Sequence, residues 1–572
     1  MSTIAATMPV AGGELVTAPE RIDAMVRELR SGASELAALA AGERAELARQ
    51  CLGRVAALSD RWEAVGAACK SMPPEDPFAI EELVLGPLMA VRQLQILARA
   101  LDDRERRGVP APPGEPFTGP DGRLRVPVFP AQGLMDKMVL TGFSGTSVMA
   151  PGVTREALER GQEDRIRQSR RARVTCVLGA GNLTAIGPMD AVERILVEGS
   201  AALLKLHPNF ADMEPVYEDA FAPLIGRGFL RICQGGAETG AYAAHHPGVD
   251  EVHITGSDRA FQAIVWGEGT DGARRRAEGA PRLAKPITGE LGNVTPWIVT
   301  PGPYTDAELA HQAEHLVGCL INNTAFNCVA PRVIVTWRGW PQRERFMDMV
   351  EGILAAIPTR RAWYPGAPER YRDFVGEPSP DIAAGHLPWT LLRDLDPAAR
   401  PRLVERECFV SASCEIALDA SDGAAFVERA AGFCNDRLGG TLSATLIVHP
   451  DARSEPRFDA ALERAVSDLR YGVVGINQWA GIAYLVMTVP WGGHPAGASL
   501  AEPYSGLGWT HDPYLLEGIE KSVFESPLVV TPKPMLFPSN RNPAGIARGL
   551  FDLTVEPGPQ TLGAVSAEVA RA

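Results

Sequence analysis

The amino-acid sequence predicts an α/β protein built from two doubly wound α/β domains. Its 572 residues are more than one hydrophobic core supports, so at least two domains are expected. Short apolar runs alternate with helical patterns between residues 173 and 266, and a second alternation begins near residue 281. Such alternation is typical of mostly parallel sheets that are covered by helices on both faces.

The region before the first alternation is expected to be mainly helical. From residue 20 to residue 108, apolar side chains recur at spacings of three and four, the period of an amphipathic helix. A stretch rich in Pro and Gly, residues 108–122, interrupts this pattern. Two short strands are expected within 123–150, and a charged helix is expected over 154–171.

The first alternating region contains four strand candidates, each followed by a turn and a helix or a further strand. They are RVTCVLGA (173–180), AALLKLHP (201–208), FLRICQGG (229–236) and EVHITGS (251–257). Because α/β sheets bind ligands outside the carboxyl ends of their strands, Lys205, Gly256 and Ser257 are expected at one sheet edge. The Gly256–Ser257 turn before a helix would offer backbone N–H groups to a phosphate.

The turn after the first strand is a weak nucleotide signal when taken alone. GAGNLTAIGP (179–188) contains Gly179 and Gly181 in a GxG pattern but lacks the third glycine of GxGxxG. A tight turn between a strand and a helix explains it equally well. The case for a dinucleotide site therefore depends on the other residues at the same edge.

The second alternating region starts with PRLAKPITGELGNVTPWIV (281–299). It continues with a helix, DAELAHQAEHLVGCLINN, and with strand candidates at RVIVTW, 439–450 and 471–480. From about residue 531 the chain is rich in Pro and only weakly patterned.

Composition and charge exclude several classes of protein. A net charge of −14 argues against a nucleic-acid binder, which would present a basic surface. No apolar run approaches 18 residues, so no membrane span is expected, and the N-terminus has no secretory signal pattern. The nine cysteines show no CxxC spacing, and no HExxH occurs, so neither a disulfide framework nor a metal site is expected. A cytoplasmic protein is the expectation.

Several ordered segments resemble motifs of the aldehyde dehydrogenase superfamily, over about residues 120–530. HITGS (253–257) is similar to the family's FTGS turn, ITGELGNVTP (287–296) to ELGGKNP, NNTAFNC (322–328) to NxGQxC, RECFV (406–410) to ExFGP, and VPWGGHPAG (489–497) to PFGGxKxSG. Asn182 and Lys205 match the family's asparagine and lysine and stand 23 residues apart. The order of these matches is far more specific than any single one, and it indicates a divergent member.

The resemblance implies NAD(P)-dependent oxidation of a small-molecule aldehyde to a carboxylic acid. Cys328 takes the position of the nucleophile, because a thiolate adds readily to a carbonyl. The Asn182 side chain and the Cys328 backbone N–H would bind the resulting oxyanion. Glu290 takes the position of the base that activates water to hydrolyse the thioester.

The cofactor, NAD or NADP, is also assigned residues by the resemblance. Lys205 would bind ribose hydroxyls, Glu407 the nicotinamide ribose, and Phe409 would flank it. Gly256 and Ser257 belong to the turn near the phosphates. Where the family has KPxE the chain reads KLHPN, so His207 or Asn209 would replace an acidic ribose ligand, and a 2′-phosphate would meet less repulsion. The choice between NAD and NADP stays open.

Other departures concern the substrate side. The family's PWN before the oxyanion asparagine reads AGN, and the second Gly of ELGG is Asn293. Phe326 replaces the Gln of GQxC. An aromatic residue two positions before the nucleophile suggests an apolar tunnel beside Cys328.

The resemblance also divides the chain into five parts. These are an N-terminal helical part of the cofactor domain (1–120), a bridging β-arm (121–152), a Rossmann-like dinucleotide-binding domain (153–285), the catalytic domain (286–500) and a C-terminal segment (501–572). IEKSVFESPL (519–528) resembles a late strand that pairs across subunits. An exposed pair of strands is a liability for a single chain, so a homodimer or homotetramer is expected.

Three alternatives remain at the level of sequence. A CoA-acylating dehydrogenase or acyl-CoA reductase would pass the thioester to CoA, although such enzymes commonly lack a hydrolytic glutamate like Glu290. A family member without catalysis would act as a structural or binding subunit. A cysteine hydrolase would need a partnered His, and none lies at a recognisable spacing.

Each candidate residue also has a structural interpretation. Cys328 could be a buried thiol, since thiols are commonly buried. Asn182 could be a turn or helix-cap residue. Lys205, Glu290 and Glu407 could be ordinary surface charges.

Overall fold

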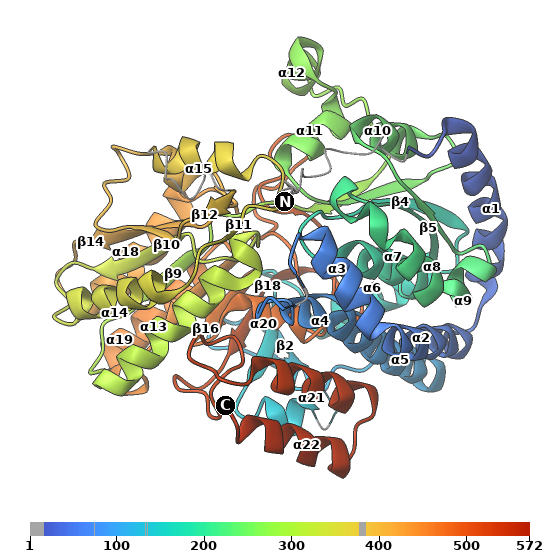
Figure 1. The fold of residues 1–572 in the computed structure, drawn as a ribbon. Coiled ribbons are helices and arrows are strands. Elements are labelled where there is room, and N and C mark those ends of the chain that lie inside the picture. Colours follow the sequence, from blue (N-terminus) through green and yellow to red (C-terminus); the bar gives the residue numbers. More distant parts are fainter. Residues whose placement is uncertain (1–15, 74, 132, 134, 377–384) are drawn as a thin grey trace, which may run out of the picture.

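A computed structural model describes residues 16–73, 75–131, 133, 135–376 and 385–572. Two large sheets dominate the described chain, one of six strands and one of ten. Figure 1 shows them in separate halves, with β4 and β5 in the right half and β9, β10 and β14 in the left. The predicted α/β class with two sheets is therefore confirmed.

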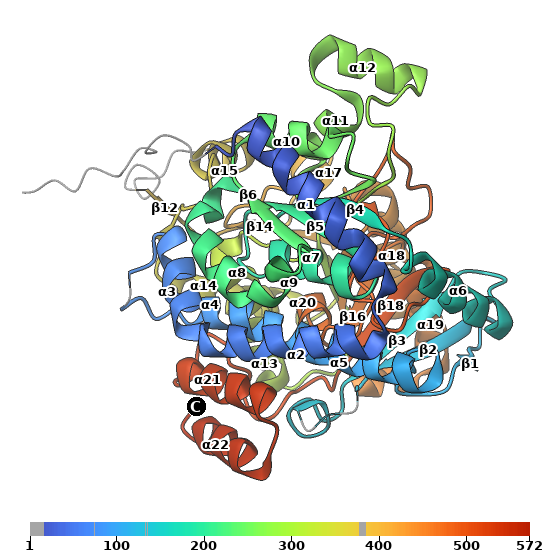
Figure 2. The same cartoon turned by 90° about the vertical axis from the view of Figure 1, so that its right-hand side faces the viewer.

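The N-terminal region is helical, as expected. It forms α1 (Pro19–Ala38), α2 (Ala41–Ala57), α3 (Ser59–Cys69), α4 (Glu81–Leu83), the π-helical turn η1 (Val84–Leu88) and α5 (Met89–Arg107). The apolar face of α1 is buried against the first sheet through Val26, Leu29 and Leu36. Figure 2 shows α1 crossing in front of this sheet, with α2 and α5 below it.

The six-stranded sheet has the doubly wound topology that the alternation predicts. Its strands are β4 (Arg173–Leu178), β5 (Ser200–Lys205), β6 (Leu230–Cys233), β7 (Glu251–Thr255), β8 (Ile287–Glu290) and β17 (Gly506–Leu507). The order is β17-β8-β7-β4-β5-β6, and only β17 is antiparallel to its neighbour. The chain runs outward from β4 in both directions, so the switch point, where such sheets bind ligands, lies beside β4.

Helices cover both faces of this sheet and connect its strands. They include α7 (Ile186–Leu196), α8 (Glu214–Ala220), α10 (Ala237–His245) and α11 (Asp258–Trp266). The charged segment after the β-arm forms α6 (Arg155–Gln168), as predicted. β8 belongs to this sheet, although its residues fall in the segment expected for the second domain.

The ten-stranded sheet combines a parallel centre with an antiparallel extension. Its strands, in spatial order, are β1 (Phe117–Thr118), β2 (Leu124–Phe129), β3 (Ser144–Met149), β18 (Ile519–Glu525), β16 (Val473–Ile476), β15 (Ser443–Ile447), β9 (Pro296–Val299), β10 (Val333–Trp337), β14 (Ala412–Leu418) and β13 (Thr390–Leu392). Its helices include α13 (Asp306–Ile321), α14 (Arg343–Ala356), α18 (Gly423–Arg437) and α19 (Pro456–Asp468).

The pairing of β18 overturns the reason given for an oligomer. β18 is hydrogen-bonded to β16 on one side and to β3 on the other, and both partners belong to the same chain. A strand with a neighbour on each edge has no free backbone groups to offer a second subunit. The exposed pair of strands expected around residues 519–528 is therefore not present.

The C-terminal segment is more ordered than its composition indicates. It forms a helical hairpin of α21 (Pro543–Val555) and α22 (Pro559–Val569). In Figures 1 and 2 this hairpin lies below the N-terminal helices, and α21 contacts α2, η1 and α5. Within the residues described, no helix combines the length and the apolar character that a membrane crossing requires.

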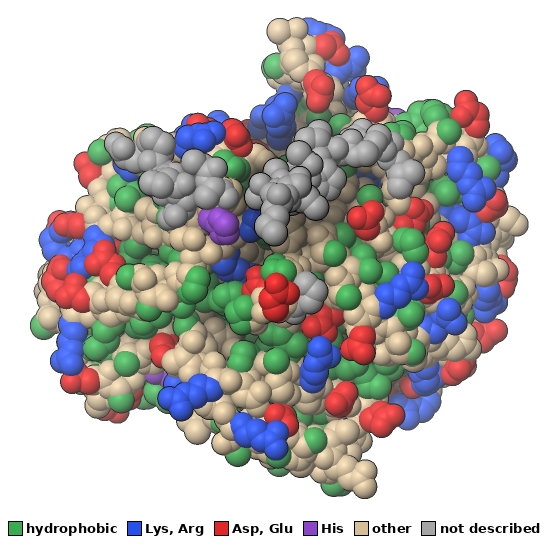
Figure 3. All heavy atoms as spheres, in the orientation of Figure 1, with side chains coloured by type: hydrophobic (Ala, Val, Ile, Leu, Met, Phe, Trp, Pro, Cys, Tyr) green, Lys and Arg blue, Asp and Glu red, His purple; other side chains and the backbone are tan. Residues whose placement is uncertain are grey.

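Acidic and basic side chains are interspersed over the face of the molecule shown in Figure 3. Hydrophobic side chains gather near the centre of that face. An interspersed pattern of this kind is typical of an ordinary protein surface and differs from the basic stripe of a nucleic-acid binder.

Candidate active site

Four neighbouring strands of the six-stranded sheet carry the predicted residues at their carboxyl ends. Asn182 follows β4, Lys205 ends β5, Gly256 and Ser257 follow β7, and Glu290 ends β8. Their order across the sheet is β8-β7-β4-β5. The structure therefore places these five residues along one edge, at the switch point of the sheet.

Cys328 lies next to the ten-stranded sheet. It lies in the turn between the short helix η4 (Asn322–Ala325) and β10, at the amino end of that strand. Residues Asn323, Thr324 and Ala325 all have positive φ, at 51°, 58° and 62°. Three successive non-glycine residues in this region are costly, and such strain persists only where surrounding contacts enforce it.

Buried polar side chains hold this turn in place. Arg332 donates to the carbonyl oxygens of Ala325 and Val410, both at 2.5 Å. The Thr295 hydroxyl donates to the carbonyl oxygen of Cys328 at 3.1 Å. The nucleophile candidate therefore sits on a backbone that is fixed on both sides.

Cys328 and Glu290 meet across the junction of the two sheets. The Sγ atom of Cys328 donates to Oε1 of Glu290 at 3.5 Å. Burial raises the pKa of Glu290 to about 7. Burial and the nearby Glu290 carboxylate also raise the pKa of the Cys328 thiol well above its usual value. The thiol therefore keeps its proton in this structure and donates it in a hydrogen bond to the Glu290 carboxyl group.

Cys328 also differs from the other cysteines in exposure. All nine are free, and seven are buried, whereas Cys328 and Cys69 are half-buried. Burial raises the pKa of the Cys69 thiol to about 12, and no carboxylate hydrogen-bonds to it among the contacts of the described residues. A reactive cysteine needs both access and an acid–base partner, which Cys328 has.

Asn182 faces the cysteine turn. Its Nδ2 atom donates to the carbonyl oxygen of Phe326 at 3.3 Å, two residues before Cys328. Asn323 donates through Nδ2 to the carbonyl oxygens of both Asn182 (3.0 Å) and Phe326 (2.8 Å). The Asn323 side chain thus links the backbone carbonyl of Asn182 to the backbone of the nucleophile turn.

A buried ion pair, which the sequence did not predict, contacts the side chain of Asn323. Lys70 donates to Oδ1 of Asn323 at 2.9 Å and pairs with Glu82 at 2.5 Å, and both charged side chains are fully buried. Glu82 also accepts a hydrogen bond from Thr184, two residues after Asn182. Lysine makes up only six of the 56 basic residues, and this rarity was the signal that could have singled out Lys70.

The cofactor side is built around Lys205. Its side chain is buried beside His207, whose ring lies against Gly181, where a Cβ would approach Nδ1 to 2.5 Å. His207 accepts the Asn209 backbone N–H at 3.2 Å, and Asn209 donates to the Gly181 carbonyl at 2.9 Å. Burial and Lys205 lower the pKa of His207 to about 4, so this ring is neutral near pH 7. Both expected ribose ligands hold the turn at residues 179–182.

The turn after β7 offers less to a phosphate than expected. The Gly256 backbone N–H donates to the carbonyl oxygen of Glu290 at 3.0 Å. The Ser257 hydroxyl accepts the backbone N–H of Ala260 at 3.2 Å and so caps α11. The Gly256 N–H is therefore already occupied, and the Ser257 side chain serves first as a helix cap.

Glu407 has the features of a ligand for a hydroxyl-bearing group. Its Oε1 atom is buried and has no hydrogen-bond partner among the described residues. Its Oε2 atom lies so close to Gly292 that a Cβ there would stand 2.2 Å away. Burial raises the pKa of Glu407 to about 8. An unsatisfied buried carboxylate is costly, so a bound hydroxyl would stabilise it.

Phe326 does not form the wall of a tunnel beside Cys328, contrary to expectation. It is fully buried, with its ring centroid 5.1 Å from Trp363, 5.4 Å from Tyr364 and 6.0 Å from Phe409. This aromatic cluster places Phe326 beside the Phe409 segment. The physical reason is the reversed turn at residues 323–325, which directs the side chain into that cluster.

Within the described residues, no group of three or more His, Cys, Asp or Glu side chains has an arrangement suited to a metal ion. The polar groups around Cys328 instead form pairs that bind or transfer protons. The arrangement provides a thiol, a carboxyl group with a pKa near neutrality, and an amide donor at the junction of the two sheets.

Known proteins resemble the chain in part of its sequence and in its fold. No family model matches the chain. A peroxisomal aminoaldehyde dehydrogenase 1 of Pisum sativum is 34% identical over 144 residues, which are 24% of this chain and 25% of the relative. A chloroplastic aminoaldehyde dehydrogenase of Arabidopsis thaliana is 33% identical over 110 residues, 19% of each protein. The chain thus matches a quarter or less of these relatives' length.

Solved structures match over nearly the whole chain. A putative aldehyde dehydrogenase from Burkholderia cenocepacia has a TM-score of 0.58 at 18% identity, covering 89% of this chain and 92% of that one. The NAD+ complex of a Mycobacterium tuberculosis aldehyde dehydrogenase has a TM-score of 0.58 at 18% identity, covering 92% and 97%. An NADP complex of a Bacillus halodurans NADP-dependent glyceraldehyde-3-phosphate dehydrogenase has a TM-score of 0.57 at 16% identity, covering 89% and 92%. These likenesses confirm the predicted aldehyde dehydrogenase fold.

Proposed function

We propose that this protein is an NAD(P)-dependent aldehyde dehydrogenase that converts an aldehyde to a carboxylic acid through a thioester on Cys328. The observation that carries the proposal is the contact of 3.5 Å between Sγ of Cys328 and Oε1 of Glu290. It brings a nucleophile and a base from different sheets to one point. The relatives' and neighbours' printed names, which include aminoaldehyde and aldehyde dehydrogenases, support the same reaction class.

In the first step, the half-buried Cys328 thiol gives its proton to solvent, and the thiolate adds to the aldehyde carbon. The carbonyl oxygen becomes an oxyanion, which the Asn182 amide and the Cys328 backbone N–H stabilise. The Asn323 side chain fixes the Asn182 backbone relative to the turn, and the second N–H of the Asn182 amide would donate to the oxyanion. NAD(P)+, when bound, supplies the acceptor for the hydride that leaves the same carbon.

In the second step, Glu290 takes a proton from water. The resulting hydroxide adds to the thioester carbonyl, and Cys328 leaves as a thiolate with release of the carboxylic acid. The thiolate then takes the proton that Glu290 holds, which restores the thiol and the carboxylate. Glu290 is suited to this role because burial raises its pKa to about 7, close to the pH at which the base must act.

The residues present fit a dinucleotide. Lys205 would bind ribose hydroxyls. Glu407 would accept a hydrogen bond from a hydroxyl group of the nicotinamide ribose at its unpartnered Oε1, and Phe409 would flank that ribose. Gly256 and Ser257 would lie beside the phosphates, within the limits set by their own hydrogen bonds. His207 is neutral, and no acidic residue follows Lys205 directly. Nothing there would repel a 2′-phosphate, so the proposal includes both NAD and NADP as candidate cofactors.

The remaining assignments are part of the same proposal. The division at residues 120, 152, 285 and 500 is retained as a functional division of the chain. A homodimer or homotetramer is retained from the resemblance alone, since β18 has both edges paired within the chain. Nine free cysteines support a reducing compartment, and we place the protein in the cytoplasm.

Purified protein with a panel of aldehydes, NAD+ and NADP+, with and without CoA, tests the proposal by absorbance at 340 nm. We expect reduced cofactor to form without CoA, and Cys328→Ser to abolish it. Reduced cofactor that forms only with CoA would instead identify a CoA-acylating enzyme. No reaction with any aldehyde would favour a subunit without catalysis.

A further inference from the structure

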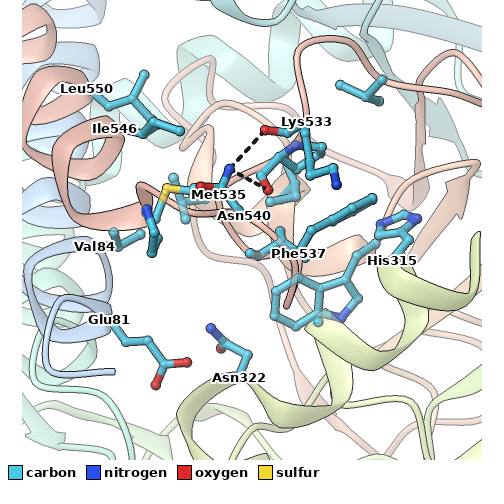
Figure 4. Close-up of a pocket in the computed structure, with 18 of the residues that line it drawn as sticks. Glu81, Val84, His315, Asn322, Lys533, Met535, Phe537, Asn540, Ile546 and Leu550 are labelled. Atoms are coloured by element: carbon cyan, nitrogen blue, oxygen red, sulfur yellow. Dashed lines mark hydrogen bonds between the residues drawn. The ribbon is translucent and has the colours of Figure 1, made fainter. Parts of the chain in front are cut away.

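A large apolar cavity lies next to the cysteine turn, on the side facing the C-terminal segment. Its volume is about 400 Å³. Its walls come from residues 77–92, residues 136–143, α13 with Asn322, Ile357, residues 478–486 and the C-terminal segment 530–569. Figure 4 shows Val84, Met535, Ile546 and Leu550 on one side of the cavity and Phe537 and His315 on the other.

Two of the lining residues contact the residues that flank the nucleophile. Trp479 donates through Nε1 to the carbonyl oxygen of Val329 at 2.7 Å. Asn322 accepts at Oδ1 from Nδ2 of Asn327 at 3.1 Å. Since Asn327 and Val329 are the immediate neighbours of Cys328, the inner wall of the cavity at Asn322 and Trp479 is one contact away from the neighbours of the nucleophile.

Each charged side chain of the cavity wall already has an ion-pair partner. Arg92 pairs with Asp136 at 2.6 Å, and both are buried. Glu81 pairs with Arg360 at 2.9 Å, and Lys533 lies 3.7 Å from Glu314. The wall therefore offers a charged ligand no uncompensated counter-ion among the described residues.

The histidine deepest in the wall is also compensated. His315 shares a hydrogen bond of 3.2 Å with Gln478, and burial lowers its pKa to about 3. A neutral, hydrogen-bonded ring presents an apolar surface to its neighbours, here the Phe537 ring, whose centroid is 5.9 Å away.

We propose that this cavity binds the hydrocarbon chain of the aldehyde, so that the substrate class is the long, unbranched alkanals. The inference rests on the proposed function for the position of the reacting carbon at Cys328. Apolar lining of this size favours a hydrocarbon chain, because burial of each methylene is favourable. An ω-ammonium group would lose its hydration without gaining a free carboxylate, so an aminoaldehyde fits the cavity poorly.

The same observation assigns a role to the C-terminal segment. Residues 530–569 contribute a large part of the cavity wall, including Met535, Phe537, Ile546 and Leu550. Without α21 and its preceding loop this side of the cavity would be open to solvent. The helical hairpin therefore completes the binding site for the chain of the substrate.

A chain-length series on the full-length protein tests the inference. With propanal, hexanal and decanal, kcat/KM should rise by up to about fourfold for each added methylene until the chain fills the cavity. Ile546→Trp, which fills the cavity from α21, should lower the decanal-to-propanal ratio of kcat/KM at least about tenfold. Arg548→Ala, on the exposed face of the same helix, should leave the ratio unchanged.

A second variant and a binding measurement separate the possible failures. If Ile546→Trp does not fold, Val84→Phe fills the same cavity from η1 and should have the same effect. Calorimetric binding of decanoate to Cys328→Ser should be tight relative to propionate and should weaken when the cavity is filled.

The outcomes distinguish the inference from the proposed function. Decanoate binding that depends on the cavity, without turnover of any aldehyde, would uphold the cavity and refute the dehydrogenase. Equal kcat/KM for propanal and decanal, decanoate binding unaffected by cavity-filling variants, or preferential turnover of 4-aminobutanal would overturn the inference and leave the dehydrogenase standing.

Discussion

The Sγ atom of Cys328 lies 3.5 Å from Oε1 of Glu290, and this contact joins the two sheets of the protein. Glu290 ends β8 of the six-stranded sheet, whereas Cys328 precedes β10 of the ten-stranded sheet. Separate sets of contacts therefore position the nucleophile and the base. Substitution of one should leave the geometry of the other intact, which makes their roles separable by experiment.

The pH dependence of turnover should follow Glu290. Burial raises its pKa to about 7, and the base acts only when deprotonated. Where deacylation limits turnover, kcat should increase as pH rises through about 7 and level off above it. Glu290→Gln should give a low kcat without this ascending limb. The check is kcat measured from about pH 5.5 to about pH 9, and an unchanged limb in the variant would identify another base.

The buried pair of Lys70 and Glu82 should contribute to both stability and activity. Lys70→Met leaves the Glu82 carboxylate buried without its cation, which costs about 3–5 kcal/mol, and it also removes a hydrogen bond to Asn323. We expect a lower midpoint of thermal unfolding and a lower kcat.

A matched control for this pair is Arg49→Met. Arg49 pairs with Asp102 at 2.5 Å on the surface, where such a pair contributes about 1 kcal/mol or less. Replacement of both buried charges, by Lys70→Met with Glu82→Gln, should recover part of the midpoint. A Lys70→Met protein as stable and as active as the original would contradict the positioning role of this pair.

Replacement of Lys205 should weaken binding of the cofactor without changing the KM for the aldehyde. A hydrogen bond from a charged donor contributes about 1.5–3 kcal/mol, so Lys205→Met should weaken NAD(P)+ binding by about tenfold or more. The aldehyde KM should change little, because Lys205 ends β5 of the six-stranded sheet, whereas Cys328 precedes β10 of the other sheet. Cofactor titrations check this, with exposed Lys137→Met as the control. Equal cofactor affinity in the two variants would remove Lys205 from the site.

The sequence predicted the framework of the site because local patterns determine it. The strand and helix periods place β4, β5 and β7 correctly, and parallel strands bring their carboxyl ends to one edge. Lys205, Gly256 and Ser257 follow from that placement, whereas Asn182 and Glu290 were assigned by the resemblance, and β8 was expected in the other domain. The two helices after residue 540 were missed because Pro and Gly interrupt their apolar period.

Contacts distant in sequence could not be predicted in the same way. Lys70 and Asn323 are 253 residues apart, and nothing in either segment specifies the other. The direction in which the Phe326 side chain points depends on the positive φ angles of the three residues before it, and the types of those residues do not predict such angles. The pairing of β18 depends on which chain supplies its neighbour, and the strand pattern carries no information on that choice.

Mass spectrometry of Glu290→Gln after incubation with decanal and NAD(P)+ tests the thioester on Cys328 most directly. We predict one equivalent of reduced cofactor, then a stall, and an acyl group attached to the peptide that contains Cys328. The same peptide from Cys328→Ala should carry no acyl group. Continued turnover without an adduct, or an acyl group on another residue, would contradict the thioester on Cys328 that is central to the proposed function.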